Sequence, residues 1–161
     1  MSRVAIVGAG YVGLPLAQVF ADAGIDVVLI DVERSVVEGI NRGESHIEDV
    51  PAETLGPLVE RGALRATTDY DDLRNAEAIL IALATPLTKQ REPDLSIVTA
   101  ACRGIAERLQ PGQLVVLEST TYPGTTRDVV QPILEEISGL KAGEDFLLAF
   151  SPERVDPGNG T

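Results

Sequence analysis

The chain has 161 residues and is 44% hydrophobic, which fits one domain with a sizeable core. Thirteen basic residues against 25 acidic ones give a net charge of −12, which argues against nucleic acid or an anionic membrane as a partner. A single cysteine excludes an intramolecular disulfide, and the lack of a signal peptide or a long apolar run predicts a cytoplasmic protein.

A glycine-rich turn is the first feature along the chain. An apolar strand is predicted at 3–7 and a helix at 11–23. Gly8, Gly10 and Gly13 have the G-x-G-x-x-G spacing. The first glycine allows a tight turn, the second a close approach of a pyrophosphate, and the third close packing of the helix on the strand. Because the N-terminus of such a helix directs N–H groups at phosphates, the pattern predicts a dinucleotide site.

The second predicted strand, at 26–30, is followed by the carboxylate of Asp31. An acidic residue at this point can accept hydrogen bonds from the adenosine ribose and repels the 2′-phosphate of NADP, so it favours NAD. Arg34 is the counter-argument, because an arginine close by can accept that phosphate. Asp31 could also cap the helix predicted at 33–42, and the two roles are compatible.

Strands and helices continue to alternate along the rest of the chain. Further strands are predicted at 63–66, 78–84, 113–118 and 145–150, and further helices at 52–61, 69–75, 95–109 and 124–138. Strands such as 78–84 are apolar on both faces, which suits a parallel sheet covered on each side. The predicted fold is therefore α/β, a Rossmann-like doubly wound parallel sheet of about six strands with helices on both faces, formed by residues 1–161 as one domain.

Three polar segments follow the last three predicted strands. They are Thr85–Thr88, Glu118–Gly124 and Ser151–Arg154. Each has ordinary loop composition when taken alone. Because ligands gather at the carboxyl ends of parallel strands, the three segments and the glycine turn together favour one common site.

These motifs give the whole chain a family resemblance. The glycine turn, Thr85-Pro86, the segment 119–123 and the segment 151–158 resemble the NAD-binding domain of the UDP-glucose/GDP-mannose dehydrogenase family. Residues 85–96 and 153–159 are most similar to its UDP-N-acetylglucosamine 6-dehydrogenase branch. The segments 119–123 and 151–158 also argue against another NAD dehydrogenase of the hydroxyacid or phosphogluconate type.

The resemblance implies a function that reaches beyond this chain. The family oxidises C6 of a nucleotide sugar twice, from alcohol to carboxylate, and reduces two NAD. It implies a UDP-sugar substrate of the UDP-N-acetylglucosamine or UDP-glucose type. The family's central helix, through which its members pair, its UDP-sugar-binding domain and its nucleophilic cysteine would all lie outside residues 1–161. The isolated chain is therefore expected to be inactive, and the alternative is a stand-alone module that binds or senses NAD(H) without catalysis.

The resemblance also implies roles for single residues. Glu153 matches a catalytic glutamate that handles protons and helps to hydrolyse a thioester, although an ion pair with Arg154 is the structural alternative. Thr121 matches a threonine that helps to position a water. Contacts to NAD are implied for Gly8, Gly10, Tyr11, Val12, Gly13, Asp31, Arg34, Thr85, Pro86, Thr120 and Thr121. The family usually has Lys or Arg where this chain has Val36, so either Arg34 substitutes or the cofactor lacks one contact.

Four remaining residues could carry chemistry but favour simpler interpretations. Cys102 lies in the helix predicted at 95–109 and is expected to be a small buried thiol. His46 has no second histidine or nearby cysteine, so no metal site is expected and a solvated loop residue is the default. Lys89 and Arg91 could meet substrate phosphates or another domain, but a solvated loop is favoured.

Overall fold

The computed structural model describes residues 2–151 and contains one parallel sheet with the strand order β3-β2-β1-β4-β5-β6. The strands are β1 (Arg3–Val7), β2 (Asp26–Ile30), β3 (Leu64–Thr67), β4 (Ala78–Ile81), β5 (Leu114–Leu117) and β6 (Leu147–Phe150). The α-helices are α1 (Gly13–Asp22), α2 (Arg34–Asn41), α3 (Ala52–Glu60), α4 (Ser96–Arg108) and α5 (Gln131–Ser138). The predicted doubly wound α/β fold is confirmed.

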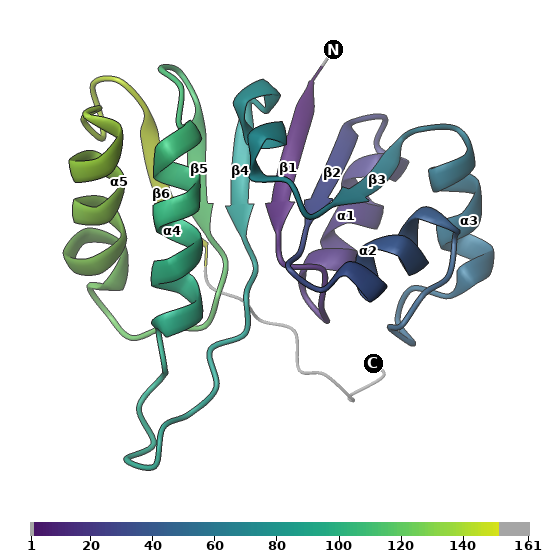
Figure 1. Ribbon diagram of the computed structural model, residues 1–161, viewed down its shortest axis with the longest axis horizontal. Helices are drawn as coiled ribbons and strands as arrows, with labels where there is room; N and C mark the ends of the chain where they lie inside the picture. The colour runs from purple at the N-terminus through teal and green to yellow at the C-terminus, as the bar shows by residue number, and fades with distance from the viewer. Residues whose placement is uncertain (1, 152–161) are drawn as a thin grey trace.

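Two apolar cores lie on opposite faces of this sheet. Side chains of α1, α2 and α3 pack on one face, and those of α4 and α5 pack on the other. Figure 1 shows α4 and α5 on the viewer's side of the sheet and α1 behind it. Successive residues of β1 and β4 enter different cores, which explains why these central strands are apolar at nearly every position.

The order in which strands are added to the parallel sheet reverses between β1 and β4. From β1 the chain runs outward to β2 and β3, and from β4 it runs outward to β5 and β6 in the opposite direction (Figure 1). Val7 pairs with Ile30 on one side and with Ile81 on the other. This register brings the residues that follow the three strands to one edge of the sheet, namely Gly8, Asp31 and Ala82. A switch point of this kind is where open α/β sheets bind ligands.

Three predicted elements differ from the structure in type or by more than two residues. The helix predicted at 69–75 is a short 3₁₀ helix, η1 (Tyr70–Asn75), and the strand predicted at 78–84 ends at Ile81. The helix predicted at 124–138 begins with a π-helical turn, η2 (Thr126–Val130), before α5. Pro132 explains the wide turn, because it has no N–H and its ring would clash with the carbonyl four residues earlier in an α-helix. Across residues 2–151, no helix has both the length and the apolar character needed to cross a membrane.

Candidate functional site

The turn after β1 requires glycine at two positions for lack of space. A Cβ on Gly8 would lie 2.5 Å from the carbonyl oxygen of Ala82, and Gly8 has φ of +109°. A Cβ on Gly13 would lie 1.7 Å from the carbonyl oxygen of Gly8, so α1 packs directly against the turn. A Cβ on Gly10 would meet nothing within 4 Å. Gly10 therefore faces open space, as a close approach of a ligand to its backbone would require.

The start of α1 presents backbone donors to that space. Among the residues that the structure describes, no acceptor is found for the backbone N–H groups of Gly10, Tyr11, Val12 and Gly13. The first turn of α1 also contains no acidic side chain that could compete for these N–H groups. Unpaired N–H groups and the positive end of the helix dipole make this turn an anion site.

Asp31 ties the end of β2 to the glycine turn. Its Oδ2 accepts a hydrogen bond from Ala9 N–H at 2.9 Å, and its Oδ1 accepts one from Glu33 N–H at 3.0 Å. Each oxygen keeps a second lone pair for a hydroxyl group. Asp31 is not the N-cap of α2, because that position belongs to Glu33 and the side chain of Asp31 closes a turn two residues earlier.

These features border a pocket of about 490 Å³ at the carboxyl edge of the sheet. Its lining includes seven residues predicted to contact a cofactor: Gly8, Gly10, Tyr11, Val12, Asp31, Thr85 and Thr120. It also includes Glu118 and Ser119 of the polar segment predicted at this edge, and six residues that the sequence did not single out: Ala9, Glu33, Ala82, Leu83, Ala84 and Ile97. Most of these are small or apolar side chains whose only signal is their place next to a strand end.

Ser119 and Thr85 join the ends of β4 and β5. The hydroxyl of Ser119 is buried, accepts a hydrogen bond from Leu83 N–H at 2.9 Å and donates one to the Ile81 carbonyl at 3.2 Å. The hydroxyl of Thr85 donates to the carbonyl of Thr120. These hydrogen bonds tie the two strand ends together, and Thr85, Ser119 and Thr120 all line the pocket.

Four other predicted cofactor residues lie outside this lining. Gly13 packs behind the turn, and Pro86 is exposed at the start of the loop that leads to α4. Arg34 is exposed in the first turn of α2 and forms no ion pair with another described residue. Thr121 borders a neighbouring hollow of about 660 Å³ together with Phe150. The contacts predicted for these residues stay predictions.

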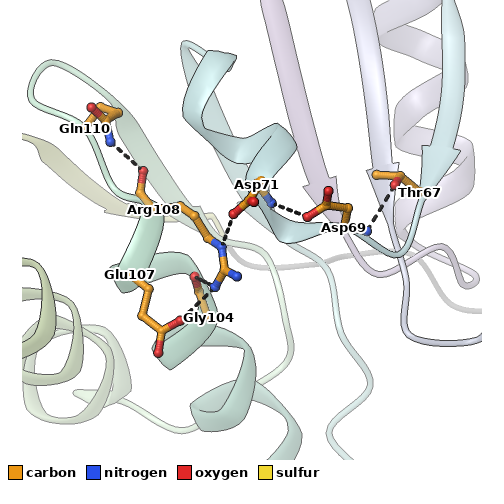
Figure 2. A network of polar contacts seen from close by, with 7 residues as sticks. All are labelled: Thr67, Asp69, Asp71, Gly104, Glu107, Arg108 and Gln110. Carbon is orange, nitrogen blue, oxygen red and sulfur yellow. Dashed lines mark hydrogen bonds and ion pairs between the residues drawn. The ribbon is translucent and has the colours of Figure 1, made fainter.

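A second hollow, of about 520 Å³, adjoins the pocket and shares Asp31, Leu83 and Ile97 with it. Figure 2 shows a polar network that includes three residues of the lining of this hollow, Asp69, Gly104 and Arg108. Arg108 Nε lies 3.0 Å from Asp71 Oδ1, and its guanidinium lies 5.7 Å from the ring centroid of Tyr70. Burial raises the pKa of Tyr70, and the negative charge of Asp31 raises it further, so its hydroxyl stays neutral near pH 7. The network holds η1 against α4, a contact that the sequence did not reveal.

Cys102, His46 and Glu153 complete the predicted residues. Cys102 is buried, which confirms the expected buried thiol, and burial raises the pKa of the thiol to about 12. His46 is exposed as expected, but it is not merely solvated, because its Nε2 lies 2.8 Å from the carbonyl oxygen of Ala9. Glu153 lies outside the described residues. No cluster of three or more His, Cys, Asp or Glu side chains suited to a metal ion is found within residues 2–151.

The geometry fits a dinucleotide. The turn offers unpaired N–H groups for two phosphates, Gly10 leaves room for them, and Asp31 offers oxygen lone pairs one strand away. Leu83 and Ile97 line both the pocket and the adjoining hollow, and their apolar side chains supply surface for flat rings in each.

Comparisons with known proteins agree with this geometry. Residues 2–161 match the family described as "UDP-glucose/GDP-mannose dehydrogenase family, NAD binding domain". The UDP-N-acetyl-D-mannosamine dehydrogenase of Pyrococcus horikoshii is 41% identical over 97% of this chain and 37% of its own length. The UDP-N-acetyl-D-glucosamine 6-dehydrogenase of Pseudomonas aeruginosa is 37% identical over 98% of this chain and 36% of its own length.

A solved structure shows the same arrangement in space. The GDP-mannose dehydrogenase of Pseudomonas aeruginosa, solved as a ternary complex, superposes with a TM-score of 0.91 at 33% identity, over 96% of this chain and 36% of that one. This chain therefore spans a little over a third of the length of the relatives that it matches. The chain belongs to the UDP-glucose/GDP-mannose dehydrogenase family, and the glycine turn, Asp31 and the pocket between them lie in its NAD-binding domain.

Proposed function

We propose that this chain is the NAD-binding part of an enzyme that oxidises C6 of a UDP-sugar to the carboxylate with two NAD. The observation that carries the proposal is the family match over residues 2–161. Two of the relatives are named as dehydrogenases of UDP-N-acetyl-D-mannosamine and UDP-N-acetyl-D-glucosamine, which supports a UDP-sugar of this kind.

The pocket suggests how the chain would hold the cofactor. The N–H groups of residues 10–13 would bind the pyrophosphate, and each bond to a charged oxygen is worth about 1.5–3 kcal/mol. Asp31 would accept hydrogen bonds from the adenosine ribose, while Thr85 and Thr120 would border the nicotinamide. NAD supplies the hydride acceptor when it is bound. The remaining work of the chain is to hold and orient it beside the sugar.

Two residues are proposed to act on the reacting groups. Glu153 would move protons, and Thr121 would help to position a water. The place of Thr121, next to Thr120 on the pocket wall, supports this assignment. Substitution Glu153→Gln in the protein that contains this chain should lower kcat strongly, with little change in the Kd for NAD. Normal turnover in that variant would contradict the assignment.

These 161 residues alone are proposed to bind NAD without oxidising a sugar. A covalent step through a cysteine needs an accessible thiolate, and the chain's one cysteine is buried with a pKa of about 12. Calorimetry should detect NAD binding, while absorbance should detect no NADH after UDP-N-acetylglucosamine is added. NADH formed by the 161 residues would refute this part of the proposal.

The decisive experiment starts from the DNA after the codon of Thr161. An open reading frame that continues into a glycine-rich segment with a cysteine supports the proposal, and a stop codon there supports the stand-alone module. The longer protein is then assayed with UDP-N-acetylmannosamine, UDP-N-acetylglucosamine and UDP-glucose. We expect two NADH per sugar oxidised for at least one of them, and no NADH with any of the three would contradict the proposed reaction.

A further inference from the structure

The side chain of His46 reaches the glycine turn from a distant part of the chain. His46 lies between α2 and α3, and its Nε2 is 2.8 Å from the carbonyl oxygen of Ala9, 37 residues earlier. The segment around it is fixed on both sides. The hydroxyl of Ser45 accepts a hydrogen bond from the N–H of Ile47, and the side chain of Ile47 is buried in the core beside α1.

The chemistry of this contact fixes the donor. A carbonyl oxygen can only accept, so Nε2 must carry a proton and donate it to the carbonyl of Ala9.

Ala9 is held on both of its peptide groups. Its N–H donates to Asp31 Oδ2 at 2.9 Å, and its carbonyl accepts from His46. The peptide bonds of the described residues are all trans, so the C=O and N–H of one peptide point in opposite directions. A carbonyl of Ala9 that points to His46 therefore directs the N–H of Gly10 away from it.

The same contact affects the start of α1. Gly13 is the first residue of α1, and its N–H would find the carbonyl of Ala9 four residues earlier in a continued helix. That hydrogen bond is not found among the described residues, whereas the next one, from Leu14 N–H to the Gly10 carbonyl, is formed at 3.1 Å. The helical hydrogen bonds of α1 therefore begin with Leu14, and among the described residues the carbonyl of Ala9 is paired with His46.

We infer that His46 is a positioning residue for the pyrophosphate of the dinucleotide. It holds the peptide between Ala9 and Gly10 in the orientation that presents N–H groups to the phosphates, and it touches neither substrate nor reacting atoms. The inference rests on the proposed placement of NAD in the pocket. It adds that affinity for the phosphates depends on a residue outside both the glycine turn and the pocket lining.

The test compares three variants with NAD and with adenosine, which has no phosphates. His46→Ala removes the donor, His46→Gln places an amide N–H at a similar reach, and Glu48→Ala changes an exposed residue of the same segment as a control. We expect His46→Ala to weaken NAD binding about tenfold and adenosine binding less than twofold. His46→Gln should recover most of the loss, and Glu48→Ala should bind both ligands normally.

Several results would overturn the inference. They are normal NAD binding by His46→Ala, equal losses for NAD and adenosine, and a His46→Gln variant as weak as His46→Ala. Failure of the unaltered chain to bind NAD would instead contradict the proposed placement of the cofactor and, with it, this inference. The results for the His46 variants thus test the role of His46, whereas NAD binding by the unaltered chain tests the pocket itself.

A spectroscopic measurement keeps the inference testable if His46→Ala folds poorly. His46 is the single histidine of the chain, so its ring nitrogens give unambiguous signals in a long-range ¹H–¹⁵N spectrum. We expect a proton on Nε2 that exchanges slowly with water. Its chemical shift should change when NAD is added, but not when adenosine is added. A rapidly exchanging proton, or the same shift with both ligands, would overturn the inference.

Discussion

Asp31 has two tasks that one substitution would disturb together. Its oxygens accept the N–H groups of Ala9 and Glu33, which holds the turn after β1 beside the turn after β2. Asp31 also lines the pocket, where its remaining lone pairs could select between a ribose hydroxyl and a ribose phosphate. The sequence predicted the second task from the position of Asp31, but the first depends on a contact 22 residues apart.

The variant Asp31→Asn should therefore lose NAD affinity and selectivity. Its amide oxygen can accept only one of the two backbone N–H groups at full strength, and its amide N–H₂ would face the other donor. We expect the Kd for NAD to rise about tenfold, equivalent to about 1.4 kcal/mol. The Kd for NADP should rise less because the negative charge is gone.

Calorimetry with both cofactors checks this prediction, and Asp49→Asn, an exposed change in the segment before α3, serves as a control. The unaltered chain should bind NAD more tightly than NADP. Equal or tighter binding of NADP by the unaltered chain would show that Arg34 outweighs Asp31.

Cys102 predicts a pH dependence of stability. Burial raises the pKa of its thiol from 9.0 to about 12, so the folded chain favours the neutral thiol. The resulting stability is fully present below pH 9, where both states are neutral, and declines as the unfolded thiol ionises at higher pH. Above pH 9, we expect the free energy of unfolding of the unaltered chain to fall more steeply than that of Cys102→Ala. The difference between the two slopes should be about 1.4 kcal/mol per pH unit.

Urea unfolding of the two proteins at several pH values between 8 and about 11 would measure that excess. Cys102→Ala starts from a lower stability because it leaves a small cavity in the core beside α4, so the slopes are compared and not the absolute values. Parallel slopes would mean that the buried thiol does not control stability in this range.

At the scale of elements, the sequence predicted best where the pattern was local. The strands at 3–7 and 26–30 match β1 and β2 residue for residue. The segment 69–75 is a 3₁₀ helix whose first turn is capped by the carboxylate of Asp69, which accepts a hydrogen bond from the N–H of Asp71. The buried amide of Gln113 then holds that turn through the carbonyls of Leu73 and Ala76, at 2.7 Å each. These long-range partners leave no mark on the local sequence.

The two glycines Gly10 and Gly13, at the junction of β1 and α1, are expected to respond differently to substitution by alanine. Gly10→Ala should fold normally and bind NAD poorly, because its Cβ meets no protein atom and would occupy the space beside the phosphates. Gly13→Ala should lose more than about 2 kcal/mol of stability, because its Cβ would collide with the backbone oxygen of Gly8.

Thermal unfolding and calorimetry separate the two effects. A Gly10→Ala variant with normal NAD affinity would show that the phosphates do not approach that backbone. Gly24→Ala is not a suitable control, since Gly24 has φ of +85° and would be strained for another reason. Gly56→Ala is a better one, because its Cβ meets open space in α3, away from the pocket, and its φ is not positive.

At the scale of the molecule, the predicted topology explains why the predicted site residues converge. A parallel sheet brings the ends of β1, β2, β4 and β5 to one edge, so residues from 8 to 120 meet in one pocket. The sequence could not predict side-chain contacts between segments far apart in the chain, such as His46 with Ala9 at that edge or Arg108 of α4 with Asp71 of η1. Those contacts depend on how the elements pack against one another, which the periodicity of a local segment does not record.

The net charge of −12 predicts how the affinity for NAD depends on salt concentration. A domain of this length has a radius of gyration of about 15 Å. Screening acts over about 30 Å at 0.01 M salt and about 8 Å at 0.15 M, so the whole negative charge repels the pyrophosphate only at low salt. NAD affinity should therefore increase a few-fold between these two concentrations, opposite to proteins that bind phosphates with basic patches. Adenosine carries no charge and should bind equally at both. A steady loss of NAD affinity with added salt would mean that cations near the pocket, such as Arg34, dominate the field that the cofactor meets.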